Sequence, residues 1–221
     1  MHSRFDGLPD SPFPRLNALI EGVSPGMDPI IMSLGEPQHP FPDFITRTII
    51  ENAQSFGKYP PIIGTPEFRA AVAGWLGRRY DMADAIGAGK PLDPDVQILP
   101  VNGTREALFN AALVATPPMK AATRPAVLMP NPFYQCYAAA ALAAGADPVY
   151  IAATADNGFM PDFVSLPDML LARTAMIYVC SPANPQGSVA SLAYLKELLT
   201  LARLHGILLA VDECYADIYD R

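Results

Sequence analysis

The fold is decided by the stretch Ala175–Gly187, which reads AMIYVCSPANPQG. Its first six residues are continuously apolar, and a turn with two prolines and a glycine follows them. An apolar run of this length without polar alternation is typical of a strand buried on both faces of a parallel sheet. We therefore predict a strand over Ala175–Cys180 that ends in a rigid turn carrying Asn184.

The same pattern extends outward from this stretch in both directions. Apolar runs without polar alternation are separated by longer amphipathic segments. Such an alternation of strands and helices is typical of an α/β fold. The other predicted strands are Gln97–Val101, Ala126–Met129, Pro148–Ala152 and Ile207–Val211. The predicted helices among them are Thr104–Ala115, Pro132–Ala144 and Leu192–His205. The sequence thus predicts an α/β fold with a mostly parallel sheet sandwiched by helices.

The first third of the chain reads differently. Residues 1–34 are rich in proline and predict an extended arm with one short helix around Arg15–Glu21. Helices are predicted over Asp43–Phe56 and Pro66–Tyr80, followed by a loop over Asp84–Pro94. The second helix is expected to bury one apolar face, made of Phe68, Ala71, Val72, Trp75 and Leu76.

Composition and charge narrow the classes of function. About half of the 221 residues are hydrophobic and 17% are charged, which is typical of a globular protein. A net charge of −7 without a basic stripe argues against nucleic acid as a partner. The longest apolar run, Tyr137–Ala153, is broken by a glycine, an aspartate and a proline, so no membrane span is expected.

Three cysteines, Cys136, Cys180 and Cys214, show no C-x-x-C spacing. We interpret them as buried, reduced thiols of a cytoplasmic protein and expect no metal site. The first residues lack the apolar core of a secretion signal, which agrees with a cytoplasmic location.

Asp212 is the first candidate for chemistry, because it stands where the apolar run Ile207–Val211 ends. Burial raises the pKa of a carboxyl group unless a cation or hydrogen-bond donors hold its charge, so we expect a positive partner. A purely structural carboxylate is the alternative. A magnesium-linked acid of an ATPase is another, but it requires a G-x-x-x-x-G-K-[ST] loop, and the GAGKP stretch at 87–91 does not fit that spacing.

Other strand ends carry complementary groups. The segment Asn102–Phe109 combines a strand end, a glycine and a helix start, which together suit an anion, although a plain helix cap by Thr104 is the alternative. The segment Asn131–Tyr137 places aromatic rings after another strand, where they either stack on a planar ligand or pack in the core. A flat, phosphorylated ligand with a ring cation would use all of these groups.

The motifs in this order resemble those of the class I/II aminotransferases, which are fold-type-I pyridoxal-phosphate-dependent enzymes. The resemblance extends from about Ser33 to Tyr219. The residues that carry it are Tyr59, Gly64-x-Pro-Glu-Phe-Arg69, Gly103-Thr-Arg-Glu-Ala-Leu108, Asn131-Pro-Phe-Tyr134, Asn184-Pro-x-Gly187 and Asp212-Glu-x-Tyr215.

The resemblance implies a role for each matching residue. Asp212 would pair with the pyridine nitrogen of pyridoxal 5'-phosphate, and Tyr134 would stack on the ring. Asn184 and Tyr215 would bind the phenolic oxygen of the cofactor. The phosphate ligands it implies are Gly103, Thr104 and Arg105, with Tyr59 reaching the phosphate of a neighbouring subunit. Gly35 would lie beside the substrate, and the protein would form a homodimer.

The resemblance also implies a domain plan and a reaction. Residues 1–40 would form an N-terminal arm and part of a small domain, and residues 41–221 the N-terminal part of the cofactor-binding large domain. The Schiff-base lysine of the family is expected beyond Arg221, because Lys58, Lys90, Lys120 and Lys196 do not fit its motif, so the chain alone is expected to be inactive.

The expected reaction moves an amino group from an amino acid to a 2-oxo acid. The motif wording is similar to that of succinyldiaminopimelate aminotransferases of lysine synthesis, which use glutamate as amino donor. Alternatives are an alanine, aspartate or kynurenine type, a fold-type-I lyase, and a cofactor-sensing regulatory domain.

Overall fold

A computed structural model describes residues 5–6, 11–30, 32, 35, 39–80, 82 and 91–218 of the chain. The chain divides into two compact units between Pro100 and Val101. One unit begins at Ser11 and ends at Pro100, and the other contains everything described from Val101 onward. The assignment of residues 41–221 to a single domain of the complete protein stays a prediction.

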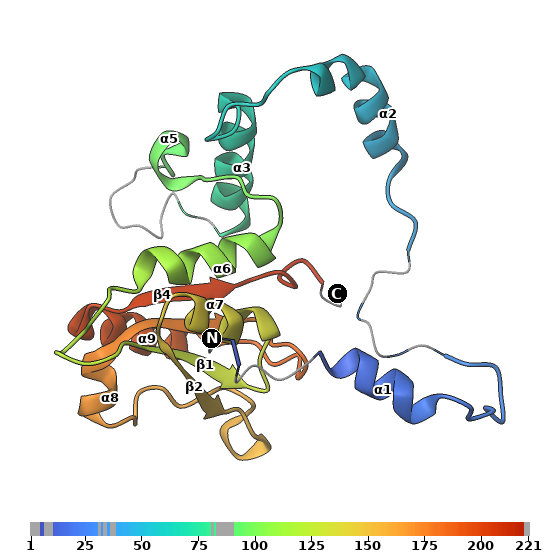
Figure 1. Ribbon diagram of the computed structural model, residues 1–221. Helices are drawn as coiled ribbons and strands as arrows, with labels where there is room; N and C mark the ends of the chain where they lie inside the picture. The colour runs from blue at the N-terminus through green and yellow to red at the C-terminus, as the bar shows by residue number, and fades with distance from the viewer. Residues whose placement is uncertain are drawn as a thin grey trace. The chain divides into compact units, whose positions relative to one another are not determined.

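The C-terminal unit is built on a four-stranded parallel sheet in the order β2-β1-β3-β4 (Figure 1). Its strands are β1 (Ala126–Asn131), β2 (Asp147–Ala152), β3 (Thr174–Cys180) and β4 (Leu208–Asp212). These strands confirm four of the sequence predictions within two residues at each end. Because all four run in the same direction, their carboxyl ends lie along one edge of the sheet.

Helices connect and cover the strands. They are α6 (Thr104–Ala115), α7 (Gln135–Ala143), α8 (Asp168–Arg173) and α9 (Leu192–His205), with a short 3-10 turn η2 (Ala155–Asn157) after β2. The bounds of α6 and α9 match the prediction, whereas α7 begins three residues later, with Tyr134 as its N-cap. The short α8 was not predicted.

Side chains from the two faces of the sheet form two separate cores. On one face, Val127 and Met129 of β1 and Met176 and Tyr178 of β3 pack against α6 and α7. On the other face, the intervening residues of the same strands pack against α8 and α9. Successive side chains of β1 and β3 therefore point to opposite faces of the sheet and contribute to both cores. This confirms the predicted layered α/β architecture.

The N-terminal unit is helical where it is described. It contains α1 (Pro12–Ile20), α2 (Asp43–Glu51), η1 (Ala53–Gly57), α3 (Pro66–Arg79) and α5 (Pro94–Gln97). Most of the loop expected over Asp84–Pro94 lies outside the described residues. The helix predicted over Asp43–Phe56 ends early, at Glu51, and the chain continues as a 3-10 turn.

The strand predicted over Gln97–Val101 is wrong. The Asp93 side chain accepts a hydrogen bond from the backbone N–H of Asp95 and thereby caps the short helix α5. This helix includes Gln97, the first residue of the predicted strand. Pro100 then has no N–H to offer a neighbouring strand. The apolar run that suggested a strand is an extended segment that pairs with no strand in the described part of the chain.

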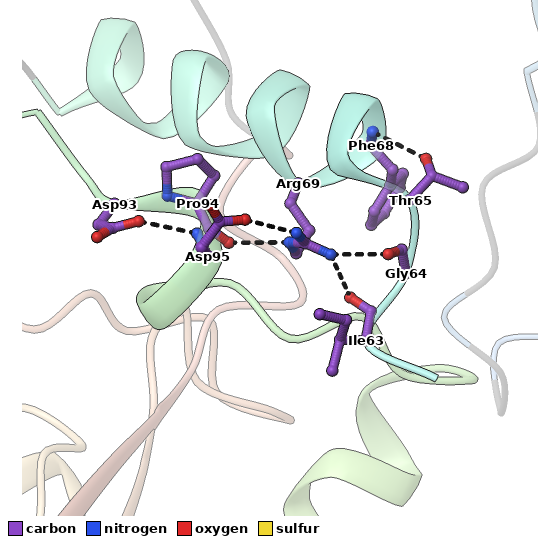
Figure 2. Close-up of polar contacts among 8 residues, drawn as sticks. All are labelled: Ile63, Gly64, Thr65, Phe68, Arg69, Asp93, Pro94 and Asp95. Carbon is purple, nitrogen blue, oxygen red and sulfur yellow. Dashed lines mark hydrogen bonds and ion pairs between the residues drawn. The ribbon is translucent and has the colours of Figure 1, made fainter. Parts of the chain in front are cut away.

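The predicted apolar face of α3 is also wrong. Phe68 and Trp75 are 51% and 42% exposed, whereas Arg69 on the same helix is only 5% exposed. Figure 2 shows the Arg69 guanidinium pointing from α3 between the loop that carries Gly64 and the start of α5. It donates to the carbonyl oxygens of Ile63, Gly64 and Pro94 at 3.2, 2.7 and 3.1 Å. It also forms a 2.5 Å ion pair with Asp95.

The arginine therefore joins α3 to the loop before it and to α5 after it. The loop requires a glycine at position 64, because its φ is +77° and a Cβ there would lie 2.5 Å from the Pro100 side chain.

No helix of the described residues is long and apolar enough to cross a membrane.

We predict that Arg69→Met destabilises the protein by about 3 kcal/mol, because three carbonyl groups lose a charged donor. Arg78→Met on the same helix is the matched control, since Arg78 is exposed and should tolerate the change. Denaturant unfolding followed by the fluorescence of Trp75, the only tryptophan of the chain, measures both variants. Equal stability of the two variants would show that the buried guanidinium does not hold this unit together.

Candidate functional site

A pocket of about 290 Å³ lies at the carboxyl ends of the strands in the C-terminal unit. This is the edge of an open α/β sheet at which ligands bind. Its wall is made by ten residues from five segments of the sequence: Thr104, Arg105, Pro130, Tyr134, Tyr137, Cys180, Asn184, Asp212, Cys214 and Tyr215.

Asp212 is the buried acid of the pocket. It is the last residue of β4 and pairs with Cys180 of β3 in the sheet, which keeps its side chain 7% exposed. Its Oδ2 accepts a 2.6 Å hydrogen bond from the Tyr137 hydroxyl, and its Oδ1 accepts a longer one, 3.3 Å, from the Cys214 N–H. Within the described part of the chain no lysine or arginine forms an ion pair with it, so the expected cation is not supplied there.

Tyr137 is held in place from its other side. Its ring stacks on that of Tyr178 with centroids 4.3 Å apart and planes 9° from parallel. Tyr178 in turn donates to the carbonyl oxygen of Leu108 at 2.6 Å. Burial and then the contact with Asp212 raise the pKa of Tyr137 far above its ordinary value. Tyr137 is therefore a protonated donor, aimed at one oxygen of the carboxylate.

The start of α6 forms a second polar region of the pocket. Gly103 is the N-cap residue, with φ +96°, and its cap position offers no side-chain hydrogen bond. The first backbone N–H groups of the helix, from Thr104 onward, consequently have no acceptor within the helix. Thr104 is the first helical residue and does not cap the helix; its Oγ1 lies 3.0 Å from Cys214 Sγ. Free N–H groups at a positive helix end suit an anion.

Tyr134 lies between these two regions. Its ring meets the ring of Tyr137 edge to face, with centroids 5.7 Å apart. The Nε of Arg105 donates to its hydroxyl at 2.6 Å. That hydrogen bond raises the pKa of Arg105 further above its ordinary value, so the guanidinium is a permanent cation. The pocket thus carries negative charge at Asp212 and positive charge near Arg105.

Asn184 and Tyr215 approach each other at a further wall of the pocket. The Asn184 amide Nδ2 donates to the Tyr215 hydroxyl at 3.4 Å. Asn184 comes from the turn after β3, and Tyr215 from the turn after β4. Burial raises the pKa of the Tyr215 hydroxyl, which therefore stays a potential donor.

The structure brings together six of the predicted site residues around the pocket: Thr104, Arg105, Tyr134, Asn184, Asp212 and Tyr215. Gly103 directly precedes them at the start of α6. Tyr59 and Gly35 belong to the other unit, and their roles stay predictions. Sequence reasoning missed Tyr137 as a polar group, because an aromatic residue in an apolar helix resembles core packing.

Cys136 and Cys180 are buried, as predicted, whereas the prediction is wrong for Cys214, which is exposed because the chain leaves the sheet after Asp212. Partial burial still raises the pKa values of all three thiols, so each is neutral. Among the residues with described positions, no group of histidines, cysteines and carboxylates could hold a metal ion. The polar groups of the pocket are therefore a buried carboxylate, a helix start whose free N–H groups suit an anion, the Arg105 guanidinium, the Asn184 amide, and the hydroxyl groups of Thr104, Tyr134, Tyr137 and Tyr215.

Comparisons with known proteins identify a family. The family model described as "Aminotransferase class I and II" matches residues 28–221. Among curated proteins, LL-diaminopimelate aminotransferase 2 of Trichormus variabilis is 30% identical, with 98% of this chain and 54% of that protein covered. The LL-diaminopimelate aminotransferase of Desulforudis audaxviator is 31% identical, with 97% of this chain and 52% of that protein covered.

Solved structures of aminotransferases share the fold. One from Neisseria meningitidis is 39% identical with a TM-score of 0.88, and covers 100% of this chain and 54% of its own. An aminotransferase from Helicobacter pylori is 31% identical with a TM-score of 0.82, covering 96% of this chain and 53% of its own. The chain therefore spans about half the length of the relatives that it matches.

We predict that Tyr137→Phe destabilises the protein more than Tyr178→Phe does. Each variant removes one buried hydroxyl donor and keeps the ring, but only Tyr137 donates to a carboxylate. Losing a donor to a charged group costs about 2–3 kcal/mol, against about 1 kcal/mol for a donor to a carbonyl. Denaturant unfolding of the two variants measures the difference, and equal losses would contradict a special role for Tyr137.

Proposed function

Because this chain belongs to the class I and II aminotransferase family, we propose that its pocket holds pyridoxal 5'-phosphate for the transfer of an amino group from an amino acid to a 2-oxo acid. One observation carries the proposal. The Asp212 carboxylate is buried, keeps acceptor capacity beyond its two hydrogen bonds and has no cationic partner among the described residues. A protonated ring nitrogen would supply both the positive charge and the further hydrogen-bond donor that the Asp212 carboxylate lacks.

The other pocket residues fit the remaining parts of the same ligand. The N–H groups at the start of α6, the Thr104 hydroxyl and Arg105 provide donors for a phosphate. Asn184 and Tyr215, which already approach each other, provide two donors for a phenolic oxygen. The Tyr134 ring offers a face for stacking.

When bound, pyridoxal phosphate supplies a conjugated ring that takes up negative charge from the α-carbon of an amino acid. Asp212 keeps the proton on the ring nitrogen, because its own negative charge favours the cationic form of a neighbouring base. Tyr137 holds Oδ2 of that carboxylate in place through the 2.6 Å hydrogen bond. The buried position of Asp212 keeps water from weakening this pairing.

We also propose that the Schiff-base lysine of the active protein is not one of the lysines in these 221 residues. Lys120 supports this reading, because its Nζ donates to the carbonyl oxygens of Thr174, His205 and Gly206 at 2.5, 2.8 and 2.8 Å. All of its N–H groups are thus engaged at the start of β3 and the end of α9. The chain alone is then expected to lack aminotransferase activity.

For the substrate we propose an amino acid of the diaminopimelate type, in the cytoplasm and in the service of lysine synthesis. The residues of the sequence motifs favour the succinylated form of diaminopimelate. The second pair of substrates would be 2-oxoglutarate and glutamate. The curated relatives support the same class, since their names refer to LL-diaminopimelate.

The test is an amino-transfer assay of the full-length protein with LL-diaminopimelate and with N-succinyl-LL-diaminopimelate, scored by glutamate formed from 2-oxoglutarate. We expect transfer from one of the two donors, and a loss of at least about 100-fold in Asp212→Asn, since such charge-stabilising groups contribute about that much. The 221-residue chain alone should give no transfer above that of free cofactor. Absence of transfer from every amino acid offered, or full activity of Asp212→Asn, would reject the proposal.

We further propose that the active protein is a homodimer and that the N-terminal unit contributes to its interface. A groove of about 540 Å³ in that unit is lined by Thr48, Ile49, Asn52, Ser55, Phe56, Lys58 and Pro60. Phe56 is 80% exposed and Tyr59 is fully exposed. Apolar side chains gathered at a surface in this way favour contact with another protein surface.

We predict that Phe56→Asp shifts the full-length protein toward monomer, because a carboxylate there would be desolvated at the interface. Met169→Asp is the control, since Met169 on α8 is equally exposed and lies in the other unit. Light scattering after gel filtration gives the mass of each variant. A dimer that persists in Phe56→Asp would remove this surface from the interface.

A further inference from the structure

Arg105 and Tyr134 make a contact that anion binding alone does not explain. The Arg105 Nε donates to the Tyr134 hydroxyl at 2.6 Å, and its Cζ lies 5.9 Å from the centroid of the Tyr134 ring. Both side chains line the pocket. A hydrogen bond through Nε leaves the two terminal NH₂ groups of a guanidinium free to bind a second partner.

No hydrogen bond to another described residue engages those terminal groups. Arg105 is the second residue of α6, next to the backbone N–H groups that lack an acceptor, and it forms no ion pair with any residue of the described part. The planar fork of an arginine matches phosphate oxygens in a bidentate manner. The same side chain can therefore hold the phosphate with its fork and Tyr134 with its Nε.

Two further contacts fix the position of the start of α7 relative to the start of α6. Tyr134 is the N-cap residue of α7, and the thiol of Cys136 in its first turn donates to the carbonyl oxygen of Arg105 at 3.3 Å. The rings of Tyr134 and Tyr137 meet at right angles. The Tyr134 side chain is thus held by contacts with both Tyr137 and Arg105.

We propose that Arg105 is a positioning residue that couples the two ends of the cofactor site, so that a phosphate bound at its fork fixes the orientation of the Tyr134 ring. This inference rests on the proposed function, since it takes the phosphate to be that of pyridoxal phosphate. Tyr134 acts on the ring of the ligand, and Arg105 acts through Tyr134 as well as on the phosphate. Each group then raises the contribution of the other to cofactor affinity.

A double-mutant cycle on the full-length protein tests the coupling. The variants are Tyr134→Phe, which keeps the ring and removes the acceptor, Arg105→Lys, which keeps the charge and removes the Nε donor, and the combination of the two. The dissociation constant of pyridoxal phosphate is measured by absorbance titration of the apoprotein. Tyr150→Phe, combined with Arg105→Lys, is the control, because Tyr150 on β2 is outside the residues that line the pocket.

We expect Arg105→Lys to weaken binding about 10-fold in the wild-type background and about 2-fold in the Tyr134→Phe background, a coupling in the range of contacting residues. In the Tyr150→Phe background the loss should stay at about 10-fold. A second measurement uses inorganic phosphate alone. Phosphate should change the ultraviolet difference spectrum of the tyrosines in the wild type and leave it unchanged in both Tyr134→Phe and Arg105→Lys.

The outcomes separate the two proposals. A wild-type protein that does not bind pyridoxal phosphate overturns the proposed function and this inference with it. Normal cofactor binding, with losses from the two single variants that multiply independently, overturns the coupling alone. A phosphate-induced spectral change that survives in Arg105→Lys would likewise show that Tyr134 is oriented without Arg105.

Discussion

The hydrogen bond between the Tyr137 hydroxyl and the Asp212 carboxylate is the contact on which the pocket depends. A carboxylate at the end of a buried strand is costly unless donors compensate for the lost water. Tyr137 provides that donor from α7, while its ring stacks on Tyr178 of β3. Tyr178 closes the chain of contacts at the Leu108 carbonyl of α6. One face of the C-terminal unit is thus arranged so that the negative charge of Asp212 can be buried and still point into the pocket.

The same arrangement separates charge along the pocket. Asp212 stands at the end of β4, while the positive end of α6 and Arg105 stand at another wall, with the Tyr134 ring between them. A ligand with a cationic ring and an anionic group is oriented by such a field in one direction only, because the reverse orientation places like charges together. The family to which the chain belongs uses a cofactor of that kind.

The central part of the fold could be predicted from the sequence because its elements carry their own signals. The segments Ala126–Met129 of β1 and Ala175–Cys180 of β3 are continuously apolar, and the turn after β3 is marked by prolines, so the sheet and the place of Asn184 follow from pattern alone. The prediction for the segment 97–101 is wrong because the Asp93 side chain caps a short helix that includes Gln97. This cap is a local hydrogen bond, which the hydrophobic pattern of the sequence does not indicate. Tyr137 was overlooked for the opposite reason, since its ring is buried in the core and only its hydroxyl reaches Asp212.

The face of α3 shows a further limit of sequence patterns. Apolar spacing placed Phe68 and Trp75 inside, yet they are partly exposed, and Arg69 is buried instead. Burial of Arg69 is stable because its guanidinium meets three carbonyl oxygens and a carboxylate, which satisfies most of its donors. Such a set of acceptors is created by the folded loop at 63–64 and the start of α5 at 94–95, and it leaves no periodic trace in the sequence.

Arg69 and Asp212 therefore show how a structural buried charge differs from a functional one. Four acceptors surround the Arg69 guanidinium, so it has little capacity left for a ligand (Figure 2). Asp212 receives one short hydrogen bond and one long one, although a carboxylate can accept about four. Asp212 also borders the pocket at the carboxyl ends of the strands. The unused acceptor capacity of a buried charge, and not burial itself, is what leads us to propose that a ligand binds beside Asp212.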